Sequence, residues 1–274
     1  MTANDKARIA SFLDLSSDSL SGGFRLRHGE HAFCDDLPDP HLIAPLPLPK
    51  ELPENETAPL NGNLAEDSLE KIAAEIATCK RCGLCGSRTN TVPGEGVAKP
   101  LVMVIGEGPG EDEDKTGRPF VGRAGQLLDR ILDAQGKIGL SRETNCYIAN
   151  ILKCRPPGNR NPQPDEINMC VPFLVKQIKA LRPKIILAAG NTAVKTLLDS
   201  TEGITKLRGS FKVFTGTPLM DGDFHIPLLP TFHPSALLRD EGLKAPVWED
   251  MRTLRARLCE LDTGYASHMA DKPL

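Results

Sequence analysis

Four of the eight cysteines have a spacing that suits a metal centre. Cys79 and Cys82 form a C-x-x-C pair, and Cys154 and Cys170 are separated by fifteen residues. Four thiolates can hold either a [4Fe–4S] cluster or a structural zinc ion, and the spacing is compatible with both.

Other arrangements of the thiols remain open at this point. Cys85 or Cys146 could replace one member of the set. A redox-active dithiol is less favoured, because Cys79 does not follow a strand in a thioredoxin-like pattern.

A glycine-rich loop, GEGPGEDED, follows an apolar run and covers residues 106–114. Glycines let a backbone approach a ligand closely. No Gly-Lys-Ser/Thr follows, and the glycine spacing misses the dinucleotide fingerprint, so a nucleotide phosphate loop is not indicated. The acidic residues would also repel a phosphate. We therefore expect a small neutral ligand here.

A second loop, TGRPFVGRAG over residues 116–125, places Phe120 between Arg118 and Arg123. Such an arrangement can form a stacking platform for a planar base, with arginine near phosphates. The alternative is that Phe120 is a core anchor and the arginines are solvated.

A third loop begins at Asn150, at the end of another apolar run. Its amide offers one donor and one acceptor, which match O4 and N3–H of a uracil ring. An asparagine here could also be a simple turn residue. Lys153, Arg155 and Arg160 follow and give the loop a basic rim.

The fourth loop reads TFHPSALLR over residues 231–239. His233 precedes a proline, which places it at a strand end or turn. Leu237 and Leu238 could wedge into a base stack if they are exposed. Alternatively, they begin a buried helix.

The elements that must position these loops alternate along the chain. Apolar runs typical of buried strands occur at residues 101–105, 146–151, 184–189 and 226–229. Helical spacing of Leu69, Ile72 and Ile76 marks a first helix, and further helical patterns occur at 125–135, 164–181, 191–198 and 248–261. This alternation predicts an α/β domain with a parallel sheet, whose ligands bind beyond the carboxyl ends of the strands.

Composition and charge exclude several classes of protein. Hydrophobic residues make up 40% and charged residues 25%, which is typical of a globular protein, and no apolar run approaches the roughly eighteen residues of a membrane span. The first twenty residues carry acidic side chains and no signal-like apolar stretch. We expect a cytosolic protein without structural disulfides.

The chain divides into an extension, a domain and a tail. Residues 1–70 hold 5 basic and 13 acidic residues, and residues 38–59 contain seven prolines. We expect residues 1–65 to be a disordered, acidic and proline-rich extension, 66–262 the catalytic domain and 263–274 a tail. Residues 71–274 carry more basic than acidic side chains, which favours an anionic ligand.

Taken together, these segments resemble the family-4 uracil-DNA glycosylases, the iron–sulfur branch of the uracil-DNA glycosylase superfamily. The resemblance runs from about Cys79 to Asp250. It rests on GEGPGEDEDKTGRPFVGRAG, YIANILKCRPPGNRNPQPDE, KLRG at Lys206–Gly209 and HPSALLR, in that order.

The resemblance implies a three-layer α/β/α domain around a short central parallel sheet, with a structural [4Fe–4S] cluster. It assigns the cluster ligands to Cys79, Cys82, Cys154 and Cys170, which leaves Cys85 as an apolar neighbour. A cytosolic zinc protein with the same four ligands and an unrelated substrate is the alternative.

The resemblance also implies the uracil pocket. Glu107 and Gly108 lie beside the base, and Phe120 stacks on it. Asn150 reads its edge, and His233 contacts O2. Glu107, Asn150 and His233 are then the expected catalytic residues, with Glu113 lining the same pocket.

The residue that activates water departs from the best-known branch of the superfamily. That branch has Asp at the third position of its GQDPY motif, where this chain has Gly108. The resemblance therefore supplies no direct general base, and Glu107 or Glu113 is the expected substitute.

The implied activity is DNA repair by base excision. Uracil is flipped out of single- or double-stranded DNA and its N-glycosidic bond is hydrolysed, with Leu237 or Leu238 filling the gap in the stack. We expect a monomer whose DNA contacts also include Arg118, Lys153, Arg155, Arg160 and Arg239. A uracil-DNA binding or damage-sensing protein without turnover is the alternative function.

Overall fold

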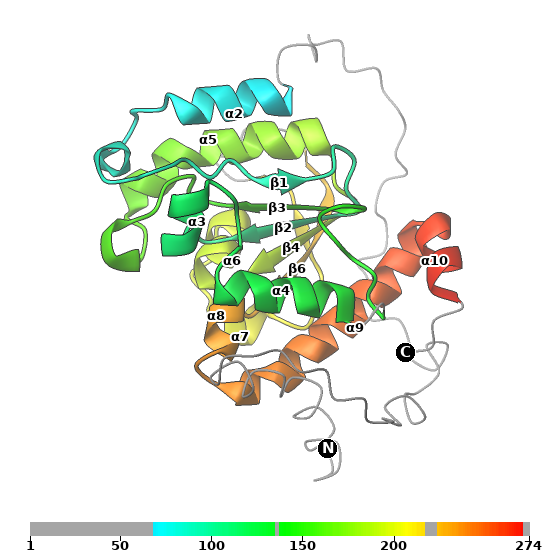
Figure 1. The fold of residues 1–274 in the computed structure, drawn as a ribbon. Helices are drawn as coiled ribbons and strands as arrows, with labels where there is room; N and C mark the ends of the chain where they lie inside the picture. The colour runs from blue at the N-terminus through cyan, green and yellow to red at the C-terminus, as the bar shows by residue number, and fades with distance from the viewer. Residues whose placement is uncertain (1–67, 135–136, 217–223, 271–274) are drawn as a thin grey trace, which may run out of the picture.

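The structure is a computed structural model, and it describes residues 68–134, 137–216 and 224–270 (Figure 1). The extension expected at residues 1–65 lies outside the described residues. Within the described part of the chain, no helix is long and apolar enough to cross a membrane.

A six-stranded sheet in the order β1-β3-β2-β4-β6-β5 forms the centre of the domain. Its four middle strands are parallel, and both edge strands are antiparallel to their neighbours. The strands are β1 (Glu95–Gly96), β2 (Val102–Gly106), β3 (Cys146–Asn150), β4 (Ile185–Ala189), β5 (Lys212–Phe214) and β6 (Ile226–Thr231).

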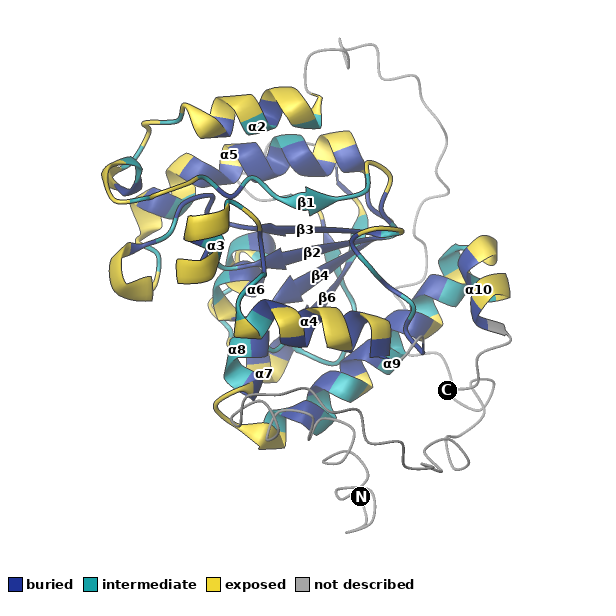
Figure 2. Ribbon diagram, in the orientation of Figure 1, coloured by how far each residue is buried: buried dark blue, intermediate teal, exposed yellow. Residues whose placement is uncertain are grey.

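Helices cover both faces of the sheet, as Figure 1 shows. Alternate strand residues point to opposite faces, so each strand contributes to two separate cores. Val102, Val104 and Ile148 pack with α4 (Arg123–Asp133) and α9 (Lys244–Leu261). Met103 and Ile105 pack with α5 (Pro164–Leu181) and α6 (Asn191–Leu198) on the opposite face. Figure 2 shows β2, β3 and β4 buried throughout, as a sheet covered on both faces requires, whereas the first two residues of β6 are only half-buried.

The helices follow the expected α/β alternation. They are α2 (Leu69–Ala77), α3 (Glu111–Thr116), α4 (Arg123–Asp133), α5 (Pro164–Leu181), α6 (Asn191–Leu198), α7 (Ile204–Leu207), α8 (Pro234–Leu237), α9 (Lys244–Leu261) and α10 (Thr263–Ala270). Short 3-10 turns lie at Gly83–Gly86, Pro157–Asn159 and Glu241–Leu243.

Local chemistry explains where the longest predicted helix begins. Pro164 occupies the first turn of α5, where its missing N–H costs no hydrogen bond. Glu166 accepts from the backbone N–H of Gln163 at 2.8 Å and pairs with Arg160 at 2.6 Å. These contacts fix both the helix start and the loop that precedes it.

The α/β prediction is confirmed, and the details differ at the sheet edges, in the short helices and at the C-terminal end of the domain. The two edge strands are antiparallel and were not predicted. Helix α9 begins at Lys244, four residues before the expected start. Residues 263–270 form α10, where we expected a tail, and Tyr265 and Met269 of this helix are buried in the core beside α9.

Candidate active site and cysteine centre

The four predicted loops meet beyond the carboxyl ends of β2, β3, β4 and β6. They line one cavity of about 650 Å³. Six predicted contacts to the base lie in its wall: Glu107, Gly108, Glu113, Phe120, Asn150 and His233. The structure therefore brings together residues that are up to 126 positions apart in the chain.

Asn150 presents an unsatisfied acceptor to this cavity. The residue is 2% exposed, and its Oδ1 has no hydrogen-bond partner within the described residues. Its backbone is fixed on both sides, because Asn150 pairs with Gly106 in the sheet and the ammonium of Lys153 donates to its carbonyl at 2.8 Å. A buried polar atom without a partner is costly, so a ligand donor at this position would be stabilising.

Phe120 is held in a backbone conformation that side chains rarely adopt. Its φ is 52°, and Arg142 donates to the carbonyls of Pro119 and Phe120 at 3.0 and 3.1 Å. The ring centroid lies 5.6 Å from that of His233. Phe120 is 5% exposed and packs in the core while it also lines the cavity, so it is a core residue, and its stacking on a base stays a prediction.

His233 is held as a neutral ring. The backbone N–H of Ser235 donates to its Nδ1 at 3.2 Å, and the Ser235 hydroxyl lies 2.8 Å from the same atom. Because Nδ1 accepts, the neutral ring carries its proton on Nε2. Burial lowers the pKa of His233 to about 4, and the charge of Arg239 acts in the same direction. The ring is therefore a hydrogen-bond donor at neutral pH.

The two acidic candidates differ in what occupies their oxygens. Glu113 accepts from the N–H groups of Gly110, Val121 and Gly122 at 2.8–3.0 Å, so its carboxylate ties the first two loops together. Glu107 accepts from the hydroxyl of Thr192 through Oε2. Glu107 is the better placed of the two to accept a proton.

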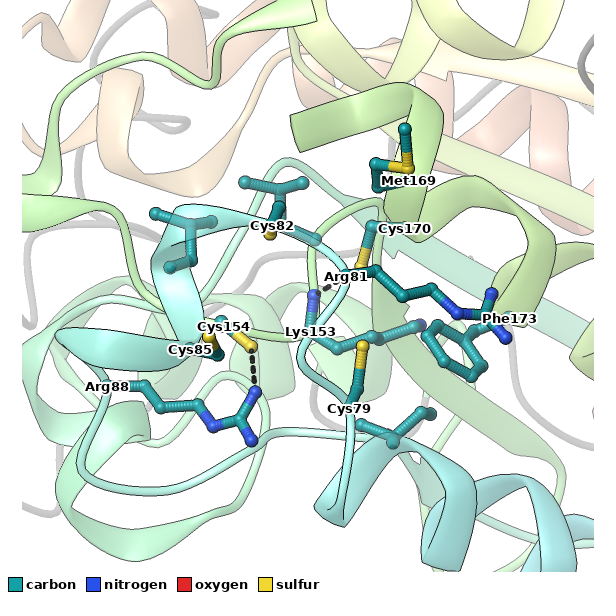
Figure 3. Close-up of a pocket in the computed structure, with 13 residues that line it drawn as sticks. Cys79, Arg81, Cys82, Cys85, Arg88, Lys153, Cys154, Met169, Cys170 and Phe173 are labelled. Carbon is teal, nitrogen blue, oxygen red and sulfur yellow. Dashed lines mark hydrogen bonds between the residues drawn. The ribbon is translucent and has the colours of Figure 1, made fainter. Parts of the chain in front are cut away.

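Five cysteines line a second cavity, whose wall Lys153 shares (Figure 3). They are Cys79, Cys82, Cys85, Cys154 and Cys170. All five are free of disulfide bonds, and apolar side chains of Ile76, Leu84, Leu152 and Phe173 share the wall. Cys146 does not line this cavity and is buried in β3, and Cys259 lies on α9.

Two donors point at sulfur atoms in this cavity. Arg88 Nη1 lies 3.2 Å from Cys154 Sγ, and the backbone N–H of Lys153 lies 3.2 Å from Cys170 Sγ. Burial raises the pKa of Cys154, and it raises the pKa of Cys170 to about 12. Such thiols stay protonated unless a bound cation displaces the proton.

The donor set fits a thiophilic cofactor, with two buried and three half-buried thiols around it. Thiolate ligands are stabilised by N–H donors of the kind that Arg88 and Lys153 provide. Across the described ranges, no three Cys, His, Asp or Glu side chains are arranged to hold a single metal ion.

Comparison with known proteins identifies the family. The model of the uracil DNA glycosylase superfamily matches residues 93–252. A type-4 uracil-DNA glycosylase of Sulfurisphaera tokodaii is 43% identical over 193 residues, covering 69% of this chain and 84% of the relative. Those of Saccharolobus solfataricus and Thermotoga maritima are 42% and 41% identical, covering 70% of this chain and 87% and 95% of theirs. The chain belongs to the type-4 uracil-DNA glycosylases.

Family membership confirms the resemblance and the expected class of enzyme, a DNA-repair glycosylase that excises uracil. The match begins fourteen residues after Cys79, so the superfamily model covers the base cavity and two of the five cavity cysteines. The relatives' similarity extends over a longer part of the glycosylase.

The predicted DNA contacts separate into three groups. Arg160, Leu238 and Arg239 line the base cavity. Arg118 lies outside it and pairs with Glu95 at 2.7 Å.

Arg155 also lies outside the cavity wall. Its Nε donates to Asn159 at 2.7 Å, and its guanidinium lies 3.5 Å from Glu111.

Lys153 and Leu237 of the glycosylase lie in the interior, so the expectation that they contact DNA is wrong. Lys153 is 1% exposed and donates to Asn150 and to Gln177 Oε1 at 2.8 and 2.7 Å, so it belongs to no basic rim. Burial lowers the pKa of Lys153 to about 8. Leu237 is 1% exposed and packs in the core, whereas Leu238 is 40% exposed.

The sequence analysis missed several residues of the site. Thr192 lines the cavity directly after β4, and Arg142 reaches Phe120 from a loop that carries no motif. Arg123, which was noted only as a neighbour of Phe120, also lines the cavity. Polar residues after the apolar run 184–189 were the available signal for Thr192.

We expect Gly106→Ala to lower the rate of uracil release at least about tenfold, because there is no room for a methyl group. A Cβ at Gly106 would lie 2.5 Å from both Asn150 Oδ1 and Phe120 Cζ. The measurement is excision from a labelled oligonucleotide, with thermal denaturation to check the fold. Gly86→Ala is the control, since its Cβ would meet nothing within 4 Å. A wild-type rate in Gly106→Ala would contradict the roles proposed for Asn150 and Phe120.

Proposed function

We propose that the glycosylase binds an extruded uracil in the cavity beyond β2, β3, β4 and β6, and that Asn150 recognises it. The observation that carries this proposal is the buried Asn150 Oδ1, which lacks a partner within the described residues. Uracil N3–H would donate to Oδ1, and the Asn150 amide N–H would donate to uracil O4. Cytosine reverses both positions, so it would leave buried groups unpaired.

The other cavity residues fit a planar, neutral ring. Phe120 would stack on the face of the base, with Glu107 and Gly108 along its side. His233 would donate from Nε2 to O2, because Nδ1 is occupied by Ser235. A neutral donor suits a ring that becomes negatively charged as it leaves.

The reaction is hydrolysis of the N-glycosidic bond. The bond between uracil N1 and deoxyribose C1′ breaks, and its electron pair leaves with the uracil ring. The water oxygen forms the new bond to C1′, while Glu107 accepts the proton that this water loses. That proton later neutralises the uracil anion, so Glu107 returns to its starting state and an abasic site remains.

A [4Fe–4S] cluster would occupy the cysteine cavity, held by Cys79, Cys82, Cys154 and Cys170. When bound, the cluster would act as a structural crosslink between loop 79–85, the end of β3 and helix α5. Arg88 and the Lys153 backbone would donate to two of its thiolates. Cys85 would remain an unligated neighbour.

The mouth of the cavity would contact DNA, and we propose that the glycosylase acts as a monomer. Arg160 and Arg239 lie at this mouth and would contact phosphates of single- or double-stranded DNA. We place the protein in the cytoplasm, associated with the nucleoid when it is bound to DNA.

We expect Leu238→Ala to slow uracil release from duplex DNA by about tenfold and from single-stranded DNA far less. An exposed leucine can replace the flipped base in the stack, and only the duplex has a gap to fill. Single-turnover rates on both substrates measure this. Leu237→Ala serves as the matched comparison. Because Leu237 is buried, removing its side chain should lower the free energy of unfolding by about 2–5 kcal/mol. Equal losses on both substrates would rule out the wedge.

The proposed function is tested by base release from a labelled oligonucleotide with one uracil, with thymine as control and alkaline cleavage of the abasic site. We expect cleavage with uracil alone and a severe loss in Asn150→Ala. An iron-replete protein that binds uracil-DNA without cleaving it would instead be a damage sensor. Absence of both cleavage and binding would contradict the proposal.

A further inference from the structure

Thr192 lies in the base cavity at the start of α6, in a turn that is fixed on both sides. Gly190, with φ of 92°, donates from its backbone N–H to the carbonyl of Thr231 at 2.9 Å. Asn191 accepts from the backbone N–H of Ile204 at 2.8 Å through Oδ1. The position of the Thr192 side chain is therefore set by contacts with two neighbouring segments.

The sheet places Thr192 opposite Glu107. Strands β2 and β4 are parallel neighbours, and Ile105 pairs with Ala188 near their carboxyl ends. Residues just beyond the two strands therefore face each other, although Glu107 and Thr192 are 85 positions apart in the chain. The Thr192 hydroxyl donates to Glu107 Oε2.

Glu107 is thereby held at its backbone and at one carboxylate oxygen. Its carbonyl accepts from the backbone N–H of Leu152 at 3.0 Å. Within the described residues Glu107 Oε1 has no hydrogen-bond partner, and Glu107 lines the cavity. The carboxylate has one oxygen anchored and the other open to a water molecule or a ligand.

We propose that Thr192 is a positioning residue for uracil excision, whose hydroxyl orients the Glu107 carboxylate toward the attacking water. The inference rests on the role proposed above for Glu107. A hydrogen bond to a charged group is stronger than one between neutral groups, and a fixed carboxylate does not have to reorient during the reaction. In this role Thr192 acts through Glu107 and not directly on the base or the water.

The test compares Thr192→Val, which removes the hydroxyl at a similar size, with Thr192→Ser, which retains it. We expect Thr192→Val to lower the single-turnover rate about tenfold, with KM and inhibition by free uracil unchanged. Thr192→Ser should recover most of this loss. Thermal denaturation and iron content of the full-length variants check that fold and cofactor are retained.

A double-mutant cycle with Glu107→Gln separates positioning from a general structural effect. If Thr192 acts through Glu107, Thr192→Val should add little to the loss that Glu107→Gln causes alone. Full additivity, or a Thr192→Ser variant as slow as Thr192→Val, would overturn the inference. A wild-type rate in Glu107→Gln would remove the proposed role of Glu107 itself, and with it the basis of the inference.

Discussion

Replacing His233 with alanine should lower kcat for uracil release by about 10²–10³-fold, the loss typical when one oxyanion donor is removed. The Nδ1 contact with Ser235 leaves Nε2–H as the donor, and nothing else at this position would replace it within the described part of the cavity. Single-turnover excision with uracil-DNA measures the loss. His233→Gln keeps an N–H donor and should lose less than His233→Ala.

The same residue predicts a pH dependence of stability. The folded-state pKa of His233 is lowered to about 4, below its ordinary value near 6.5. As the pH falls from about 6.5 to about 4, the unfolded chain binds a proton that the folded chain does not, so the free energy of unfolding decreases. Denaturant unfolding across this range should show a shallower decrease in His233→Gln. An NMR titration of His233 with a midpoint near 6.5 would contradict the neutral ring.

Cys79→Ser should remove the iron and lower the unfolding temperature by about 10 °C. Loss of a bound group that crosslinks three segments costs several kcal/mol, and each kcal/mol shifts the midpoint by about 2–4 °C in a domain of this size. Iron content, absorbance near 400 nm and calorimetry are the measurements. The absorbance also distinguishes iron from the zinc alternative.

Cys85→Ser provides the matched control, because Cys85 lines the same cavity as Cys79. We expect this variant to keep its iron and its unfolding temperature. If Cys85→Ser loses the iron while Cys79→Ser retains it, then Cys85 is the ligand and Cys79 is the neighbour.

Sequence periodicity located the elements that are long and buried. Helices α5 and α6 have the predicted bounds, because their ends carry recognisable chemistry such as Pro164 in the first turn of α5. The edge strands β1 and β5 were missed because two and three residues are too few to show an alternation. The sequence of residues 263–270 resembles a polar tail. These residues form α10, whose Tyr265 and Met269 are buried only by tertiary contacts.

The parts of the site that sequence reasoning missed depend on the order of strands in space. Nothing in the chain order says that β4 lies beside β2, so Thr192 could not be matched with Glu107. Lys153 was expected on the surface because lysine is rarely buried. Its partner Gln177 lies 24 positions away on α5, and no local pattern connects the two residues.

The five residues from Asn150 to Cys154 carry both the amide proposed to read uracil and a thiol of the cysteine cavity. Lys153, between them, holds Cys170 Sγ with its backbone N–H and the Asn150 carbonyl with its ammonium. A backbone shift at Asn150 should therefore also displace Cys154, and the reverse. The base cavity and the cysteine cavity are mechanically coupled through this segment. Substitutions in the packing around the cysteines should therefore change the selectivity for the base. This should hold even at positions that do not contact DNA.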